Sequence, residues 1–186
     1  MKHTITVFIL LILLLGFYSC SKNNESIRRD VIVSQKSSAF IIPITTDTLD
    51  DVIFGKIPMT LNLDSLIKVQ DEQFGIENIS SIKISGFKVE LTDTNSANTF
   101  ANFNFMNAQI VAVGKDSVEL ASINSIQEVA AKTLTIPVVN QSVELRSYLL
   151  ESNYSYILSG VLRHKTTKTL TSIITPQFTI TLNKEF

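Results

Sequence analysis

Short runs that alternate between apolar and polar residues recur along most of this chain, and they limit its fold more than any other feature. The run KIPMTLNL places Ile57, Met59, Leu61 and Leu63 at every second position, with Pro58 or polar residues between them. Successive side chains of a strand point to opposite faces of a sheet, so a period of two is typical of a strand buried on one face. Thr, Ser, Ile, Val and Phe are abundant from about residue 39 onward, which also favours strands.

Several other segments are strand-like. In SSIKISGFKVEL the alternation changes phase at Gly86, which predicts a β-bulge at that residue. In FANFNFMNAQIVAVG we expect Phe103 and Phe105 to share one face of a strand. Pro43 in FIIPIT has no backbone N–H to donate, so that segment is expected at the edge of a sheet. The remaining strand-like runs are DSVELASI, AKTLTIPVV, YSYILSGVLR and LTSIITPQFTITLN.

Two segments favour short helices. DSLIKVQDEQFG loses the alternation, and we expect Asp64 to cap a helix that ends at Gly75. The apolar stripe expected on this helix consists of Leu66, Ile67 and Val69. SVELRSYLL predicts a second short helix with Ser142 as its cap.

Together these runs give about seven or eight short strands with one or two short helices. We therefore expect an all-β fold, an antiparallel β-sandwich formed by one domain of residues 39–186. A closed barrel is the main alternative, because alternation alone does not distinguish a barrel from two packed sheets.

The chain begins with MKHTITVFILLILLLGFYSC, in which Lys2 precedes an unbroken apolar run from Val7 to Leu15. A charged start, a short apolar run and a small residue before the cleavage point are the three parts of a secretory signal. The apolar run is about half of the ~20 residues that a membrane-spanning helix needs. We expect residues 1–19 to be removed, which leaves Cys20, the single cysteine of the chain, as the first residue.

The FYSC segment resembles the signals of bacterial lipoproteins, which are cleaved directly before a cysteine whose sulfur carries diacylglycerol. Phe17 and Ser19 are choices of the kind seen in the Bacteroidota phylum, and SKNNE resembles its short polar surface-export tag. The layout from about Ile57, with SIKISGFKVEL, FNFMNAQI and PQFTITL, resembles small lipoproteins of that phylum without an assigned biochemical role. The resemblance implies an outer-membrane lipoprotein of the cell envelope, attached to the membrane through acylated Cys20 and facing the periplasm or the cell surface.

Residues 20–38 are mostly polar, and we expect them to form a flexible tether between the lipid and the domain. An edge strand that begins at the apolar patch Val31–Val33 is the alternative.

Composition argues against several classes of function. The 16 Lys and Arg residues nearly balance the 17 Asp and Glu residues, and no basic block stands out, so nucleic acid is not an expected partner. Acylation of Cys20 leaves no thiol for a disulfide, a zinc site or Cys-His catalysis. His164 is the histidine that remains after signal removal, and a solvated turn is favoured over a catalytic triad at its position. We therefore expect no catalytic residue, metal or cofactor.

An aromatic cluster is one candidate ligand site. Phe87, Phe103, Phe105 and Phe178 could line a pocket for an apolar or lipid ligand, since such pockets are mostly apolar. Ordinary sandwich core is the favoured interpretation, because a domain of this size needs large side chains to fill it. Core positions are likewise favoured over a sugar-stacking platform for the three tyrosines, Tyr148, Tyr154 and Tyr156.

Short polar loops supply the remaining candidates. Asp47, Asp50 and Asp51 lie close together, but their spacing matches no established calcium loop, so a solvated loop is favoured. The triplets DTL, DSL and DSV resemble the O-glycosylation pattern of Bacteroidota, which makes Thr48, Ser65 and Ser117 candidate modification sites. Asp-Ser pairs are also common in turns and helix caps.

These observations favour a lipid-anchored, non-catalytic envelope protein that binds a partner protein or a glycan through exposed loops and sheet edges. A carrier of a small apolar or lipid ligand within the sandwich is the alternative. A hydrolase is the least favoured hypothesis.

Overall fold

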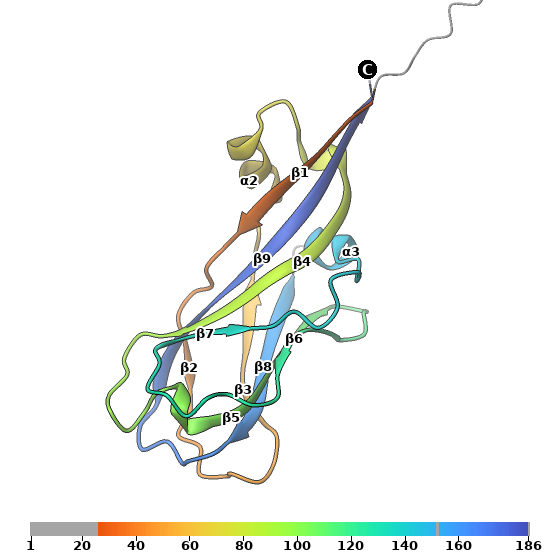
Figure 1. Ribbon diagram of the computed structural model, residues 1–186. Coiled ribbons are helices and arrows are strands. Elements are labelled where there is room, and N and C mark those ends of the chain that lie inside the picture. The colour runs from red at the N-terminus through yellow and green to blue at the C-terminus, as the bar shows by residue number, and fades with distance from the viewer. Residues whose placement is uncertain (1–25, 152, 186) are drawn as a thin grey trace, which may run out of the picture.

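The computed structural model describes residues 26–151 and 153–185. Cys20 and the predicted signal peptide lie outside the described residues. The described chain forms two antiparallel sheets packed face to face, so the predicted β-sandwich is confirmed and the barrel alternative is wrong (Figure 1). Nine strands make up the described part of the sandwich, slightly more than the seven or eight predicted.

One sheet has five strands in the order β1-β9-β4-β7, with β2 also paired to β9. The long strand β9 therefore has β4 on one side, and on the other side it has β1 and β2 one after the other. The strands of this sheet are β1 (Ser26–Ser34), β2 (Phe40–Ile42), β4 (Ile79–Leu91), β7 (Thr133–Ile136) and β9 (Leu170–Glu185).

The second sheet has four strands in the order β3-β8-β5-β6. Its strands are β3 (Val52–Met59), β8 (Tyr154–Leu162), β5 (Phe103–Ala112) and β6 (Val118–Ile123). At Gly160 in β8 the backbone of β5 comes so close that a Cβ atom would lie 2.1 Å from the Phe105 carbonyl oxygen. Glycine is required at this position because it alone leaves room for the neighbouring strand.

The helices are short. They comprise α2 (Leu63–Gln70), α3 (Arg146–Leu149) and the 3₁₀ turns η1 (Ile76–Asn78) and η2 (Phe100–Asn102). Asn62 caps α2 by accepting the Ser65 N–H, so the predicted cap at Asp64 is wrong.

Three further details of the helices differ from the expectation. Helix α2 ends at Gln70 rather than Gly75, and Val69 is 79% exposed, so it does not belong to a buried stripe. Helix α3 begins without a side-chain cap, and the Ser142 hydroxyl donates to the Asn140 side chain instead. Both helices are too short for local signals to fix their ends, because most of their stability comes from packing against the sheets.

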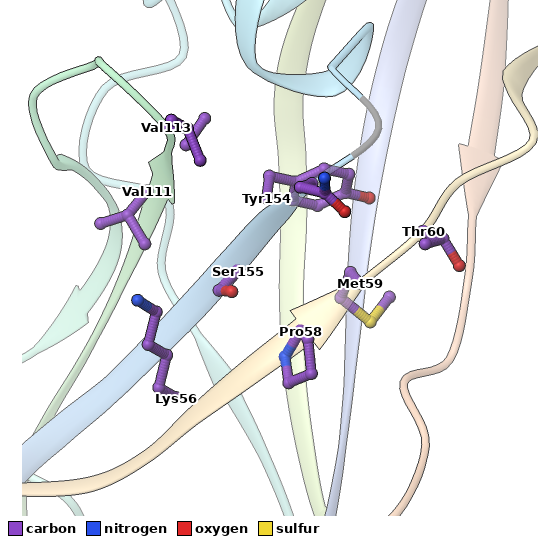
Figure 2. Close-up of a pocket in the computed structure, with 10 residues that line it drawn as sticks. Lys56, Pro58, Met59, Thr60, Val111, Val113, Tyr154 and Ser155 are labelled. Atoms are coloured by element: carbon purple, nitrogen blue, oxygen red, sulfur yellow. The ribbon is translucent and has the colours of Figure 1, made fainter.

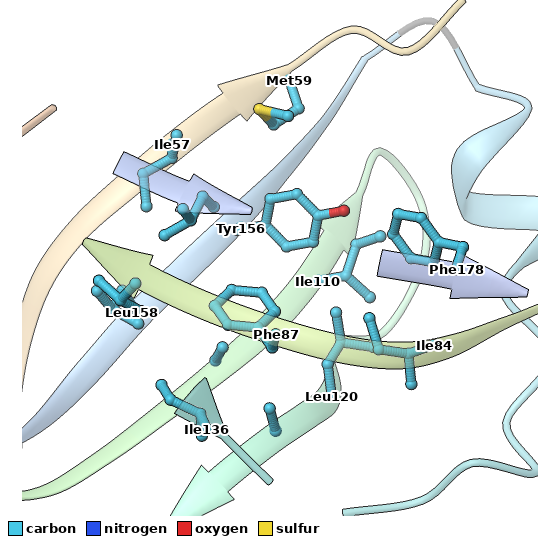
Figure 3. Close-up of a cluster of buried hydrophobic side chains, with 14 of the residues drawn as sticks. Ile57, Met59, Ile84, Phe87, Ile110, Leu120, Ile136, Tyr156, Leu158 and Phe178 are labelled. Atoms are coloured by element: carbon cyan, nitrogen blue, oxygen red, sulfur yellow. The ribbon is translucent and has the colours of Figure 1, made fainter. Parts of the chain in front are cut away.

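The core lies between the two sheets and is filled by aliphatic and aromatic side chains (Figure 3). Phe87 of β4 meets Tyr156 of β8 edge to face at 5.8 Å between ring centroids, which joins the two sheets. Phe54 and Phe103 make a similar contact at 5.3 Å. Such aromatic pairs contribute about 0.5–1.5 kcal/mol beyond the burial of their area.

The structure of β4 confirms both the buried face and the bulge predicted from its sequence. Ile82, Ile84, Phe87 and Val89 all face the core, and the pairing with β9 shifts register between Ile84 and Gly86, where the bulge was predicted. The bulge explains why the alternation changes phase and all four side chains still reach the same face.

Residues 26–34 form the edge strand β1, so the predicted tether is too long. Strand β1 pairs with β9 along its whole length, from Ser26 opposite Glu185 to Ser34 opposite Gln177. Val31 is buried in the core, which agrees with the alternative expectation of an edge strand at this patch. The chain is already part of the sheet six residues after Cys20.

The two ends of the sandwich differ in character. At one end, here called the tip, β1 begins beside the end of β9 (Figure 1). At the other end, here called the loop end, hydrogen bonds join the connecting loops 43–51, 92–99, 124–132 and 163–169. Within the described residues, no helix has the length and apolar character needed to cross a membrane.

Candidate functional site

The outer face of the four-stranded sheet is the candidate site. Along most of β3, β5 and β8, side chains on this face alternate with core residues, with interruptions at the register shifts, so the sequence pattern that builds the core also sets which residues point outward. The strand register aligns the outward residues into three rows across the sheet. These rows are Ile53–Ser159–Asn107–Ser122, Lys56–Ile157–Gln109–Glu119 and Pro58–Ser155–Val111.

Two hollows lie on this face. The first has a volume of about 490 Å³ and is lined by Lys56, Pro58, Ser155 and Val111, among others (Figure 2). Figure 2 shows these side chains coming from three neighbouring strands, β3, β8 and β5. Polar and apolar atoms are mixed in the lining, which suits a ligand with both kinds of surface.

The second hollow has a volume of about 660 Å³ and lies toward β6. Phe105, Asn107, Glu119 and Ser122 line it, and the segment 137–139 after β7 borders it. This segment is held against the four-stranded sheet by a bridge between Val138 and Ala121. The middle row of the outer face supplies Lys56 to the first hollow and Glu119 to the second.

Several polar groups of the outer face have no partner within the described part of the chain. The side chains of Lys56, Gln109 and Glu119 make no hydrogen bond or ion pair there. The Asn107 Oδ1 atom accepts a 2.8 Å hydrogen bond from the Ser159 hydroxyl, which leaves the Asn107 Nδ2 group free to donate. Hydrogen-bond donors and acceptors on this surface are therefore free of bonds to other described residues and are available to a ligand.

The predicted aromatic pocket is not formed by its four proposed residues. Phe87, Phe103 and Phe178 are at most 1% exposed and belong to the packed core, which was the favoured interpretation. Phe105 lies on the outer face, because a register shift between Phe103 and Phe105 turns the second ring away from the first. The expectation that these two rings share one face is therefore wrong.

Two buried tyrosines have hydroxyl groups without a hydrogen-bond partner. Tyr154 and Tyr156 are 3% and 0% exposed, and neither hydroxyl makes a hydrogen bond of normal geometry to another described residue, although the two hydroxyls interact with each other. Their rings meet edge to face at 5.7 Å. Burial raises the pKa of Tyr154 to about 12 and raises the pKa of Tyr156 well above its usual value, because a phenolate is poorly solvated there. The core interpretation of these two tyrosines is confirmed.

The loop end is tied together by Asn102 at the end of η2. Its side chain accepts the Thr99 N–H at 2.9 Å and donates to the carbonyls of Ala97 and Lys165. These bonds join the loop before η2 to the loop after β8. Asn102 is buried, and its full set of partners makes the loop end a defined surface rather than a set of independent loops.

His164 lies in an exposed turn at the loop end, as predicted. Its Nε2 atom lies 2.8 Å from a Glu128 carboxylate oxygen, and this contact lowers the pKa of Glu128. Asp47 accepts the N–H groups of Leu49 and Asp50, which lower its pKa. In residues 26–151 and 153–185, no group of three or more His, Cys, Asp or Glu side chains is arranged to hold a metal.

The three candidate modification residues lie on three separate segments. Thr48 is half-buried in the loop before β3, Ser65 is exposed in the first turn of α2, and Ser117 is exposed in the segment directly before β6. Whether they carry glycans stays a prediction.

Sequence reasoning missed the outer face as a site. Lys56, Gln109 and Glu119 appear in the sequence as ordinary polar positions of three separate alternating runs. The three residues become neighbours only through the register of the strands, and the register between strands distant in sequence depends on long-range pairing that no local pattern encodes.

Comparison with known proteins adds no functional assignment. No family model matches the chain, and no curated protein matches it. A solved structure with a similar course is the BFDV capsid protein in a decamer, with 11% identity, a TM-score of 0.37, and coverage of 84% of this chain and 99% of that one. A chain of mud crab tombus-like virus has 9% identity and a TM-score of 0.38 over 94% of this chain and 98% of its own. Likeness at this level carries no conclusion about function.

Proposed function

We propose that this chain is a non-catalytic outer-membrane lipoprotein, anchored through acylated Cys20, that binds a partner protein or a glycan. The outer face of the four-stranded sheet is the proposed contact surface, together with the loop end. The anchor part of this proposal rests on the resemblance of the FYSC segment to lipoprotein signals. The binding part assigns a contact surface to the anchored domain.

The position of β1 supports an anchor at the tip. Cys20 precedes Ser26 by six residues, so the chain between them reaches at most about 20 Å. The tip is then held near the bilayer, and the loop end lies at the far end of the long strands (Figure 1). A single acyl chain gives only marginal membrane binding, whereas a diacylglycerol together with an N-acyl chain buries three chains and gives a stable anchor.

The outer face carries the proposal of binding. It combines two hollows with polar side chains that have no hydrogen-bond or ion-pair partner among the described residues. An anchored binder gains effective concentration for a ligand on the same surface, so a modest affinity is sufficient.

Site-specific crosslinking in cells tests this proposal. A photo-crosslinking amino acid at Gln109 is compared with the same amino acid at Gln177, a glutamine exposed on the outer face of the other sheet. We expect membrane-associated crosslinked products from position 109 and none from position 177. Equal crosslinking at both positions, or none at position 109, would contradict the proposed contact surface.

Cell fractionation tests the anchor separately. We expect Cys20→Ala to carry no lipid, so that any chain cleaved after residue 19 moves from the membrane fraction to the soluble fraction, while uncleaved chain is recognised by the added mass of residues 1–19. A cleaved Cys20→Ala chain that stays in the membrane fraction would contradict the lipoprotein part of the proposal.

A further inference from the structure

The middle row of the outer face has a chemistry that narrows the class of ligand. Lys56, Gln109 and Glu119 stand on β3, β5 and β6, with Ile157 of β8 between the first two. Neighbouring strands lie about 4.8 Å apart, so the row extends about 14 Å from β3 to β6. The row thus presents three kinds of hydrogen-bonding group in one line across the sheet: the Lys56 ammonium donates, the Gln109 amide both donates and accepts, and the Glu119 carboxylate accepts.

We propose that this row binds a neutral oligosaccharide lying across the four strands. The inference rests on the proposed function, since it names the ligand of the same surface. Sugar hydroxyls both donate and accept, so they can pair with all three side chains and with the free Asn107 amide. Ile157 and the half-buried Phe105 offer apolar surface to the C–H faces of sugar rings.

The charges of the row favour a neutral ligand over a charged one. Lys56 and Glu119 have opposite charges at opposite ends of the row, so their sum is zero. A polyanion would meet the Glu119 carboxylate, and a polycation would meet the Lys56 ammonium, each without a compensating partner. An uncharged polyhydroxylated chain meets neither penalty.

A protein partner fits this row less well than a sugar does. The centres of protein interfaces are depleted of lysine and glutamate. Here the charged groups of Lys56 and Glu119 lie on either side of the Gln109 amide, and neither has a partner within the described residues that would neutralise it on burial. Sugar binding leaves such groups partly hydrated, and bridging water then costs little.

Calorimetric titration of the detergent-extracted, lipidated protein tests the inference. The probes are neutral hexasaccharides, namely maltohexaose, cellohexaose, xylohexaose and mannohexaose, with oligogalacturonate and chitosan hexamer as charged counterparts. We expect at least one neutral probe to bind and the charged probes to bind at least tenfold more weakly. We expect Gln109→Ala and Lys56→Met each to weaken the neutral probe about fivefold, as for loss of one hydrogen bond.

Gln177→Ala is the matched control, because it removes the same side chain from the opposite sheet. We expect it to bind the neutral probe within twofold of the unchanged protein. Circular dichroism and thermal melting show whether each variant is folded. Lys56 and Gln177 are exposed and Gln109 is half-buried on the outer face, so none of the three substitutions removes a core side chain.

Three outcomes would overturn the inference. They are failure of all neutral probes to bind, equal or tighter binding of a charged probe, and equal loss of affinity in Gln109→Ala and Gln177→Ala. If crosslinking at position 109 still captures a protein under any of these outcomes, the proposed function stands and only the ligand class is wrong. If that crosslinking also fails, both are wrong.

Discussion

The unpartnered tyrosine hydroxyls give the sharpest stability prediction. Tyr156 is fully buried (Figure 3), and its hydroxyl makes no hydrogen bond of normal geometry among the described residues, where it interacts with the Tyr154 hydroxyl alone. A buried polar group without a hydrogen bond costs about 1–3 kcal/mol. Tyr156→Phe removes that cost and leaves a void of one oxygen atom, whose lost contacts amount to less than about 1 kcal/mol. We therefore expect the free energy of unfolding to rise by about 1 kcal/mol.

Urea denaturation at pH 7 measures this change directly. A gain of about 1 kcal/mol corresponds to a melting temperature about 2–4 °C higher for a domain of this size. Phe87 serves as the control, because its ring contacts Tyr156 at 5.8 Å and has no hydroxyl to remove. Phe87→Leu should destabilise the protein by about 1 kcal/mol or more. A loss of stability in Tyr156→Phe would refute the reasoning, since it would mean that the hydroxyl has a stabilising partner.

The same pair predicts a fall in stability at alkaline pH. An unfolded tyrosine ionises near pH 10, whereas Tyr154 keeps its proton to about pH 12 in the folded chain. The unfolded state therefore binds fewer protons in this window, and stability falls as the pH rises. The slope is about 1.4 kcal/mol per pH unit for each tyrosine. The double variant Tyr154→Phe, Tyr156→Phe should lose this slope in urea denaturation at pH 10–12, and an unchanged slope would assign it to other groups.

Three further predictions concern the remaining fold and the modification sites. Gly160→Ala should lower the free energy of unfolding by about 3 kcal/mol in urea denaturation, because the new Cβ would clash with the Phe105 carbonyl oxygen. Gly114→Ala is the control: it has open space around it and should lower the free energy of unfolding by about 1 kcal/mol, because Gly114 has a positive φ. Equal losses in the two variants would contradict the close strand contact at Gly160. Asn102→Ala should lower the free energy of unfolding by about 2–4 kcal/mol, because it removes three hydrogen bonds. It should also speed proteolytic cleavage of the loops at the loop end. An unchanged cleavage rate would show that these hydrogen bonds do not order the loops. Glycopeptide mass spectrometry of protein from its native host should find glycan on one or more of the three candidate residues, and unmodified peptides at all three would end that prediction. The candidates are Thr48, Ser65 and Ser117.

Local pattern predicts the parts of this fold in which each strand is buried on one face. In β4, the alternation of Ile82 and Ile84 and its change of phase at Gly86 correctly predicted the buried face and the bulge. In β5 the same reasoning failed, because a register shift after Phe103 has no glycine to mark it and turns Phe105 outward. A bulge without a local signal is set by pairing with β8, which the sequence of β5 does not contain.

Polar residues at a strand edge are the other source of error. The segment from Ser26 is mostly exposed, and its composition resembles a tether, but backbone pairing with β9 holds it in the sheet. Backbone hydrogen bonds do not depend on side-chain type, so composition underestimates such a strand.

The candidate site was beyond sequence prediction for a related reason. Lys56 and Glu119 are 63 positions apart in sequence and meet in one row only through three strand pairings. The composition of each strand shows that its outward residues are polar, but not which of them become neighbours.

Intact-mass measurement of the membrane-extracted mature protein tests the central claim most directly, because the anchor determines where the binding surface can act. We expect a chain that begins at Cys20 and carries the mass of a diacylglyceryl group and an N-linked acyl chain. A chain of residues 20–186 without lipid mass, or one that retains the first nineteen residues, would contradict the account.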